Sequence, residues 1–146
     1  MMITLFVLLG LILLAATWIR LAPVDASRWH QFPENADPRI PDSATPNSRL
    51  SHRSYAESAK DIMERLNGVA LQTPRTKVLA GLPEDGMVTY VTRSRIWGFP
   101  DYTTAIARTD DAGGTTLMLF GRAGIGAYDW GVNGKRIDLW LEALDS

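Results

Sequence analysis

The sequence contains no cysteine among its 146 residues. This absence excludes disulfide bonds, a thiolate nucleophile, a zinc site built on cysteine and a lipid anchor attached to cysteine, and it is compatible with either redox compartment. Histidine is scarce as well, with His30 and His52 far apart in a proline-rich segment. Metal ligands on one helix or hairpin stand much closer together. We therefore expect no metal ion and no cofactor.

The chain also lacks an excess of charge of either sign, with 15 Lys and Arg residues against 16 Asp and Glu residues. Proteins that bind nucleic acids need a surplus of basic residues to neutralise phosphates, so we expect no nucleic-acid partner. The sequence has no Gly-x-Ser-x-Gly elbow, and Gly124-Ile125-Gly126 is not followed by the Gly-Lys-Ser/Thr of a phosphate-binding loop. It therefore predicts no catalytic residue and favours a protein that is not an enzyme.

A long hydrophobic run opens the chain, since residues 3–19 carry no charged side chain. As a helix, this run would extend roughly 26 Å at about 1.5 Å per residue, close to the ~30 Å hydrocarbon core of a bilayer. Trp18 and Arg20 suit the membrane interface. The sequence predicts a transmembrane anchor over residues 1–22. The alternative is a cleaved signal peptide with its site at Val24-Asp25-Ala26, although the two residues before the run include no Lys or Arg.

Two arguments about the side of the membrane oppose each other. Arg20 and Arg28 come after the hydrophobic run and no basic residue precedes it, which favours a cytoplasmic domain by the positive-inside rule. An anchor at the extreme N-terminus, however, most often exports the domain attached to it. We expect a single-pass protein of the bacterial inner membrane with a periplasmic domain.

Residues 23–53 are rich in proline, which fixes φ and removes a hydrogen-bond donor. On this basis the sequence excludes a long helix and a central strand from this segment. The aromatic side chains of Trp29, His30 and Phe32 are costly to leave in water. The segment is therefore predicted to be an extended strap packed on the domain or on a partner, with a disordered tether and an interfacial Trp29 as alternatives.

Residues 54–146 are predicted to form an α+β globular domain. A helix is expected over residues 54–67, with Ser54 and Glu57 as a capping box and Asn67-Gly68 as its end. A period of two then indicates strands joined by short turns, including one over residues 110–114. The expected strands cover residues 75–82, 87–97, 102–109 and 115–123.

A second helix is predicted at the end of the chain, because apolar residues recur there at helical spacing. They are Ile137, Trp140, Leu141 and Leu144. Asp129 or Asn133 would cap this helix. The predicted fold is therefore an N-terminal transmembrane helix followed by a four-stranded antiparallel sheet packed with two helices.

Three stretches of the sequence carry a family resemblance. Residues 93–101 read RSRIWGFPD, and Trp29-His30 followed by Pro33 comes shortly after the hydrophobic run. The closing stretch contains Gly126, Asp129, Gly131, Val132, Asn133, Arg136 and Ile137. In these stretches the chain resembles the domain of unknown function 1499 family, small membrane-anchored bacterial proteins whose activity is unassigned. The resemblance implies fold and topology, but no chemistry.

Basic residues stand near the ends of the predicted strands and at the start of the last helix, whose N-terminus itself attracts anions. They are Arg93, Arg95, Arg122, Lys135 and Arg136. If these ends meet, the side chains would form a pocket for a carboxylate, a phosphate or a lipid headgroup. The alternative is that Asp101 and Asp129 neutralise the cations in ion pairs.

Three functions remain open. The first is a non-enzymatic accessory or interaction subunit of an inner-membrane protein complex, in contact with lipid and with partner helices through Gly10, Ala15 and Ala16. The alternative is a binding module for an anionic small molecule or lipid headgroup. The third is a hydrolase in which Asp101 and Asp129 act as acid and base.

Overall fold

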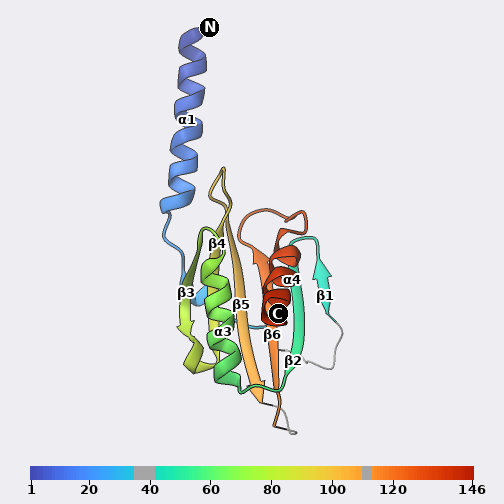
Figure 1. Cartoon of the computed structure of the whole chain (residues 1–146). Coiled ribbons are helices and arrows are strands. Elements are labelled where there is room, and N and C mark those ends of the chain that lie inside the picture. Colours follow the sequence, from blue (N-terminus) through green and yellow to red (C-terminus); the bar gives the residue numbers. More distant parts are fainter. Residues whose placement is uncertain (35–41, 110–112) are drawn as a thin grey trace.

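The computed structural model describes residues 1–34, 42–109 and 113–146, so parts of the predicted strap and of the turn over residues 110–114 lie outside the described residues. A long apolar helix, α1 (Met2–Leu21), projects from one end of the folded domain (Figure 1). By length and composition α1 fits a membrane span, and a signal sequence passes the same test. The domain itself combines an antiparallel sheet with two helices, as the predicted α+β class requires.

The sheet has six strands rather than the predicted four, in the order β1-β2-β6-β5-β4-β3. All neighbouring strands are antiparallel. The strands are β1 (Ser43–Thr45), β2 (Ser48–Tyr55), β3 (Thr76–Leu82), β4 (Met87–Arg93), β5 (Pro100–Thr109) and β6 (Thr115–Ala123). The four predicted strands correspond to β3 to β6, although β4 ends at Arg93 and β5 begins at Pro100.

The exclusion of a strand from the proline-rich segment was wrong for its last residues. The segment between Ser48 and Tyr55 contains no proline, and β2 pairs along its whole length with β6. Since β1 covers its other edge, β2 is an inner strand. Its sequence, SRLSHRSY, shows no apolar alternation because most of its residues are polar, and the one buried residue of the strand is Ser51.

The first domain helix, α3, covers Ala59–Gln72 instead of residues 54–67. Its N-cap is Ser58, whose Oγ accepts a hydrogen bond from the Asp61 amide at 3.2 Å, because Ser54 belongs to β2. Asn67-Gly68 does not end the helix. The turn after Gly68 buries Ala70 completely, which offsets the cost of about 1 kcal/mol for a glycine inside a helix.

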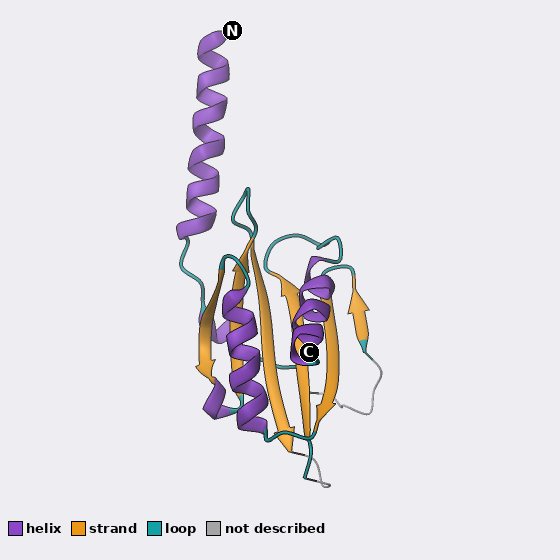
Figure 2. Ribbon diagram, in the orientation of Figure 1, coloured by secondary structure: helices purple, strands orange, loops and turns teal. Residues whose placement is uncertain are grey.

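Helices α3 and α4 (Val132–Leu144) cover one face of the sheet, which we name the helix face (Figure 2). The predicted apolar stripe of α4 is buried there. Trp140 meets the ring of Tyr90 edge to face, with 5.5 Å between the centroids, and donates from Nε1 to Thr73 Oγ1 at 2.8 Å. The core between helices and sheet also contains Ile62, Met63, Leu66, Val88, Leu117 and Leu119.

The opposite face of the sheet, the strap face, is covered by the segment that comes after α1. This segment includes the short helix α2 (Ala26–Trp29). The ring of Trp29 stacks on that of Tyr102 with 3.9 Å between centroids, and Phe32 lies against Phe120. His30 Nδ1 lies 3.0 Å from Thr89 Oγ1. The aromatic residues of the strap thus pack on the domain, as the sequence predicts.

The position of the α3 cap gives a direct test of the observed boundary. Replacing Ser58 by Ala removes the acceptor for the Asp61 amide and should lower the free energy of unfolding by about 1 kcal/mol. Ser54→Ala is the matched control: its exposed side chain stands in β2, so the change should stay within about 0.5 kcal/mol. Denaturant unfolding of the full chain in detergent measures both. A larger loss at Ser54 would restore the helix boundary expected from sequence.

Candidate functional site

The five predicted site cations do not share one pocket, because alternate residues of a strand point to opposite faces. Arg93 and Arg122 lie on the strap face, whereas Arg136 lies on the helix face. Arg95 lies in the turn beyond the end of β4 and lines a pocket together with Arg93. Lys135 shares a separate hollow of about 290 Å³ with Arg136 on the helix side.

Arg136 is paired rather than free. It is 9% exposed, and its Nη2 donates to Asp101 Oδ2 at 3.0 Å. Its Nη1 donates to Asn133 Oδ1 at 2.8 Å, and Asn133 donates in turn to Asp129 Oδ2. Burial raises the pKa of the Asp101 carboxyl, and the hydrogen bond and charge of Arg136 oppose that rise only in part. For Arg136, the structure therefore contains the ion pair that the sequence offered as the alternative to an anion pocket.

The closing stretch builds the start of α4. Asp129 accepts from the amides of Gly131 and Asn133 at 2.8 and 3.2 Å, so its carboxylate satisfies orphan donors of the helix. The N-cap position itself is Gly131, whose φ of 74° is left-handed and suits glycine. Gly126 also has a positive φ, and its carbonyl accepts from Asn47 Nδ2 at 3.5 Å. Because Asp101 and Asp129 both serve these contacts, the geometry gives no support to an acid–base pair.

Arg122 is partly buried on the strap face, and it has no carboxylate partner among the described residues. Its Nη2 donates to the Trp29 carbonyl at 2.6 Å and to Thr104 Oγ1 at 2.7 Å. The guanidinium lies over the rings of Trp29 and Phe120, 5.4 and 4.7 Å from their centroids. Burial lowers the pKa of Arg122 to about 10, so the group is still charged at neutral pH. Through these contacts Arg122 helps to hold the strap in place, together with the ring contacts of Trp29 and Phe32.

A basic pocket of about 410 Å³ lies where the end of α1 meets β3 and β4. Its lining residues are Arg20, Arg75, Lys77, Val91, Arg93, Ser94, Arg95 and Gly98. Five of these eight residues are cationic, and none carries a carboxylate side chain. We name this cavity the basic pocket. Arg93 and Arg95 were predicted as site residues, but the other three cations were not. The pairing of β3 with β4 brings Arg75 and Lys77 to the pocket, and the contact of α1 with the β4–β5 loop brings Arg20.

Backbone carbonyls hold two of the pocket's arginines. Arg20 Nη2 donates to the carbonyls of Arg95 and Ile96. Arg93 Nη1 donates to the carbonyls of Ile19 at 3.0 Å and Gly98 at 2.9 Å. These bonds join the last turn of α1 to the loop between β4 and β5, and they fix the guanidinium groups at the rim of the cavity.

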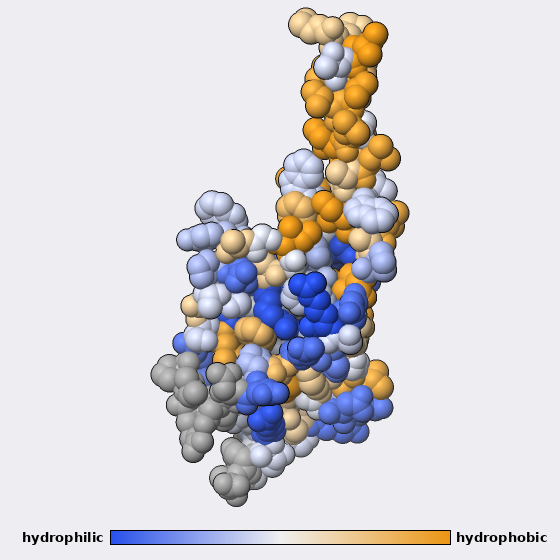
Figure 3. All heavy atoms as spheres, turned by 180° about the vertical axis from the view of Figure 1, so that it is seen from behind, coloured by the Kyte–Doolittle hydropathy of each residue, from blue (hydrophilic) through white to orange (hydrophobic). Residues whose placement is uncertain are grey.

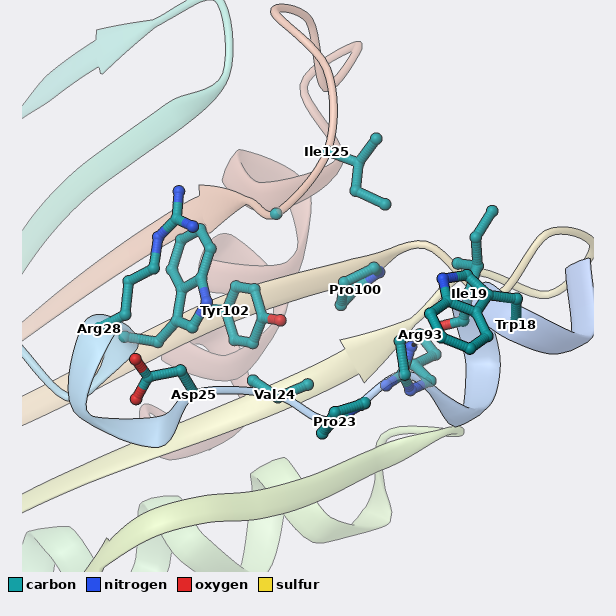
Figure 4. Close-up of a pocket in the computed structure, with 13 residues that line it drawn as sticks. Trp18, Ile19, Pro23, Val24, Asp25, Arg28, Arg93, Pro100, Tyr102 and Ile125 are labelled. Atoms are coloured by element: carbon teal, nitrogen blue, oxygen red, sulfur yellow. Dashed lines mark hydrogen bonds between the residues drawn. The ribbon is translucent and has the colours of Figure 1, made fainter. Parts of the chain in front are cut away.

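A second cavity of about 350 Å³ lies on the other side of Arg93, between the segment after α1 and the ends of β5 and β6 (Figure 4). Trp18 and Ile19 stand at one end and the stacked Tyr102 ring at the other, while Asp25 gives the cavity a carboxylate. Its lining is mixed in charge, in contrast to that of the basic pocket. No group of three His, Asp or Glu side chains suited to a metal ion occurs among the residues that the structure describes.

A family model described as a protein of unknown function (DUF1499) matches residues 23–144. The chain belongs to this family. The match begins directly after α1 and includes the strap, the sheet and both domain helices, so it confirms the resemblance seen in the sequence. A search of curated proteins finds no match. The family description assigns no activity, so the function has to be argued from the structure.

The pairing of Asp101 with Arg136 predicts a strong coupling between the two residues. Asp101→Asn or Arg136→Met alone leaves a buried group without its partner and should cost about 3–5 kcal/mol of unfolding free energy. The double variant should lose clearly less than the sum of both changes. Denaturant unfolding of the full chain and the three variants in detergent gives the coupling energy.

The pH dependence of the unfolding free energy supplies a control for this double-mutant comparison. Without Arg136 the pKa of Asp101 should rise further, so the folded variant binds a proton that the unfolded chain does not. The stability deficit of Arg136→Met should therefore shrink as the pH falls from 7 towards 5. Additive losses, or a deficit that grows in acid, would contradict the ion pair.

Proposed function

We propose that this family member is a single-pass protein of the bacterial inner membrane whose domain acts, without catalysis, as an accessory or interaction subunit of a membrane protein complex. The observation that carries the proposal is the joint between α1 and the domain. Arg20 donates to the carbonyl of Ile96, and Arg93 donates to that of Ile19. These bonds support a retained helix, because cleavage near Ala26 would remove both Arg20 and Ile19 from the protein.

The surface of α1 supports a membrane location. The helix is strongly apolar, and within this fully described helix Ala16 is the only buried residue. An apolar surface of this length is costly to expose to water. In Figure 3 the hydrophobic column of α1 stands above a face rich in hydrophilic residues. Apart from Ala16, the apolar surface of α1 is available to lipid and to partner helices.

Two loops of the domain lie at the end from which α1 projects (Figure 1). We name them the membrane-facing loops: residues 94–99, between β4 and β5, and residues 124–131, between β6 and α4. They expose Ile96, Trp97 and Phe99 in the first loop and Ile125, Tyr128 and Trp130 in the second. Trp130 is 84% exposed. Because Trp and Tyr favour the membrane–water interface, these loops support a domain that rests on the bilayer.

The proposed orientation places the domain in the periplasm. Since the chain has no native cysteine, single-cysteine variants can report it directly. Glu84→Cys lies in the 3₁₀ turn η1 (Pro83–Asp85), between β3 and β4 and away from the membrane-facing loops. A membrane-impermeant maleimide should label it in cells with a permeabilised outer membrane, whereas Leu13→Cys, in the middle of α1, should stay unlabelled even after lysis.

Two further measurements test the membrane anchor and the contact of the loops with the bilayer separately. The chain should stay in the membrane after alkaline carbonate washing and keep residues 1–26 by mass spectrometry. A polarity-sensitive dye on Tyr128→Cys should emit at shorter wavelength in liposomes than on Glu84→Cys. Labelling of Glu84→Cys only after lysis would reverse the orientation, and a mature chain starting after Ala26 would refute the anchor.

An accessory subunit should remain attached to a partner through its span. Gly10→Leu fills a position where an added Cβ meets nothing within 4 Å, and it should obstruct close approach of a partner helix. We expect affinity isolation in mild detergent to recover roughly tenfold less partner, for a loss of about 1–2 kcal/mol in helix packing. Leu9→Ile, which conserves size, is the control. A chain that runs alone and monomeric would argue against the accessory role.

A further inference from the structure

We propose that the basic pocket is a binding site for a phosphate group, with the headgroup of an anionic phospholipid as the ligand beside the membrane. The pocket is formed by segments that are distant in the sequence: the last turn of α1, the start of β3 and the end of β4. Only the lipid as a source rests on the proposed anchoring of α1. Recognition of the phosphate itself rests on the pocket, four of whose five cations belong to the domain and one, Arg20, to α1.

The charge of the pocket is uncompensated. Within the described residues, none of its five cations forms an ion pair with a carboxylate. Elsewhere cations are commonly paired, as in Arg53 with Asp145, Arg65 with Glu57 and Arg136 with Asp101. The chain has one acidic residue more than it has basic residues, so unpaired cations do not follow from its composition. Like charges in one cavity repel, and a bound anion would relieve that repulsion.

Several N–H groups of the basic pocket make no hydrogen bond to the described protein. Arg93 uses Nη1 for two carbonyls, which leaves the hydrogens on Nε and Nη2. Arg75 donates from Nε to the Arg93 carbonyl and keeps both terminal nitrogens. The side chains of Lys77 and Arg95 donate to no acceptor of the described residues, although the backbone of Lys77 pairs with Val91 in the sheet. Guanidinium groups held in this way match phosphate oxygens through paired, charge-assisted hydrogen bonds.

The backbone at the pocket is strained in a way that favours a functional role. Arg75 has a φ of 62°, in the left-handed region that a bulky side chain rarely occupies. Its carbonyl accepts from the Arg93 amide at 3.0 Å, and its side chain returns to the Arg93 carbonyl. The fold thus keeps a costly conformation that places one cation beside another, which fits a site selected for a ligand.

The place and size of the pocket fit a lipid phosphate. Arg20 belongs to the last turn of α1, two residues after Trp18, where an apolar span would reach the headgroup layer. A volume of about 410 Å³ lies within the common range for small-ligand sites. Basic side chains held close to a membrane surface attract anionic headgroups electrostatically.

Lys77 and Arg95 are suited to the test, because neither side chain makes a hydrogen bond or ion pair to the described protein. The variant Lys77→Gln/Arg95→Gln should therefore fold normally. Lys60→Gln/Arg108→Gln removes the same charge from exposed sites outside the pocket lining and is the matched control. Thermal unfolding of both full-length variants in detergent checks their folding.

Binding is measured with the full chain in a phosphate-free non-ionic detergent at constant ionic strength. Native mass spectrometry compares phosphatidylglycerol and cardiolipin with phosphatidylcholine, and calorimetry follows inorganic phosphate and pyrophosphate. We expect an anionic lipid to bind at least about tenfold more tightly than phosphatidylcholine. The Lys77/Arg95 variant should lose about tenfold of that affinity through its missing charge-assisted contacts, and the control should lose almost none.

The outcomes separate the two sources of phosphate. Saturable binding of the soluble anions without lipid preference, lost in the pocket variant, would assign the site to a free phosphate compound and overturn the lipid. Equal losses in both double variants would show a non-specific charge effect, and no binding in either arm would remove the site; both results overturn the proposal. These binding measurements do not depend on carbonate washing or cysteine labelling, which test the anchor independently.

Discussion

The alternation of side chains between the two faces of the sheet is the constraint on which the rest of the structure depends. On β4, Tyr90 enters the core beneath the helices, whereas Thr89 meets His30 on the strap face. On β6, Leu119 joins that core and Arg122 points the other way, to Trp29. A slip of one residue would exchange the two sets. The register that buries the core therefore also decides which cations can meet.

Three arginine side chains in different surroundings differ in the partners that stabilise their charge. Arg136 is buried and has a carboxylate partner, so removing either group leaves a charge or an acceptor without compensation. Arg122 is partly buried against neutral acceptors and aromatic rings, and the lowering of its pKa reflects the cost of desolvation. Arg93 lies at the rim of the basic pocket, bonded to carbonyls alone among the described residues. The buried Arg136 has a carboxylate partner, whereas the partly buried Arg122 and Arg93 have none among the described residues.

Much of the fold could be predicted from local patterns. The apolar stripe around Ile137 and Trp140 and the alternation over β3 to β6 are set by nearby residues, so they could be recognised. Strand β2 could not, because a partly exposed strand rich in Ser and Arg carries no apolar signal and depends on its partner β6. The helix start was misplaced for a related reason: Ser54 and Ser58 both precede an acidic residue by three positions, and only sheet pairing assigns Ser54 to a strand.

The candidate site depended even more on long-range pairing. The interpretation of Asp101 and Asp129 as partners of the basic residues was sound for Arg136, since opposite charges in one motif tend to pair. The basic pocket needed information absent from any short stretch. It requires the register of β3 against β4, the left-handed backbone of Arg75 and the return of α1 to the β4–β5 loop. No periodicity in the sequence reports these three features.

The conformation of the β4–β5 loop is relevant to the question whether α1 is retained in the mature protein. Gly98 has a φ of 75°, and a Cβ built on it would clash with Cγ of Arg20. The position therefore requires glycine both for its backbone and for the close approach of the helix. If the chain were cut after Ala26, Arg93 would keep the Gly98 carbonyl but lose that of Ile19, and the basic pocket would lose one cation. The fit of this loop around the last turn of α1 therefore supports the proposal that anchor, loop and pocket act as one unit.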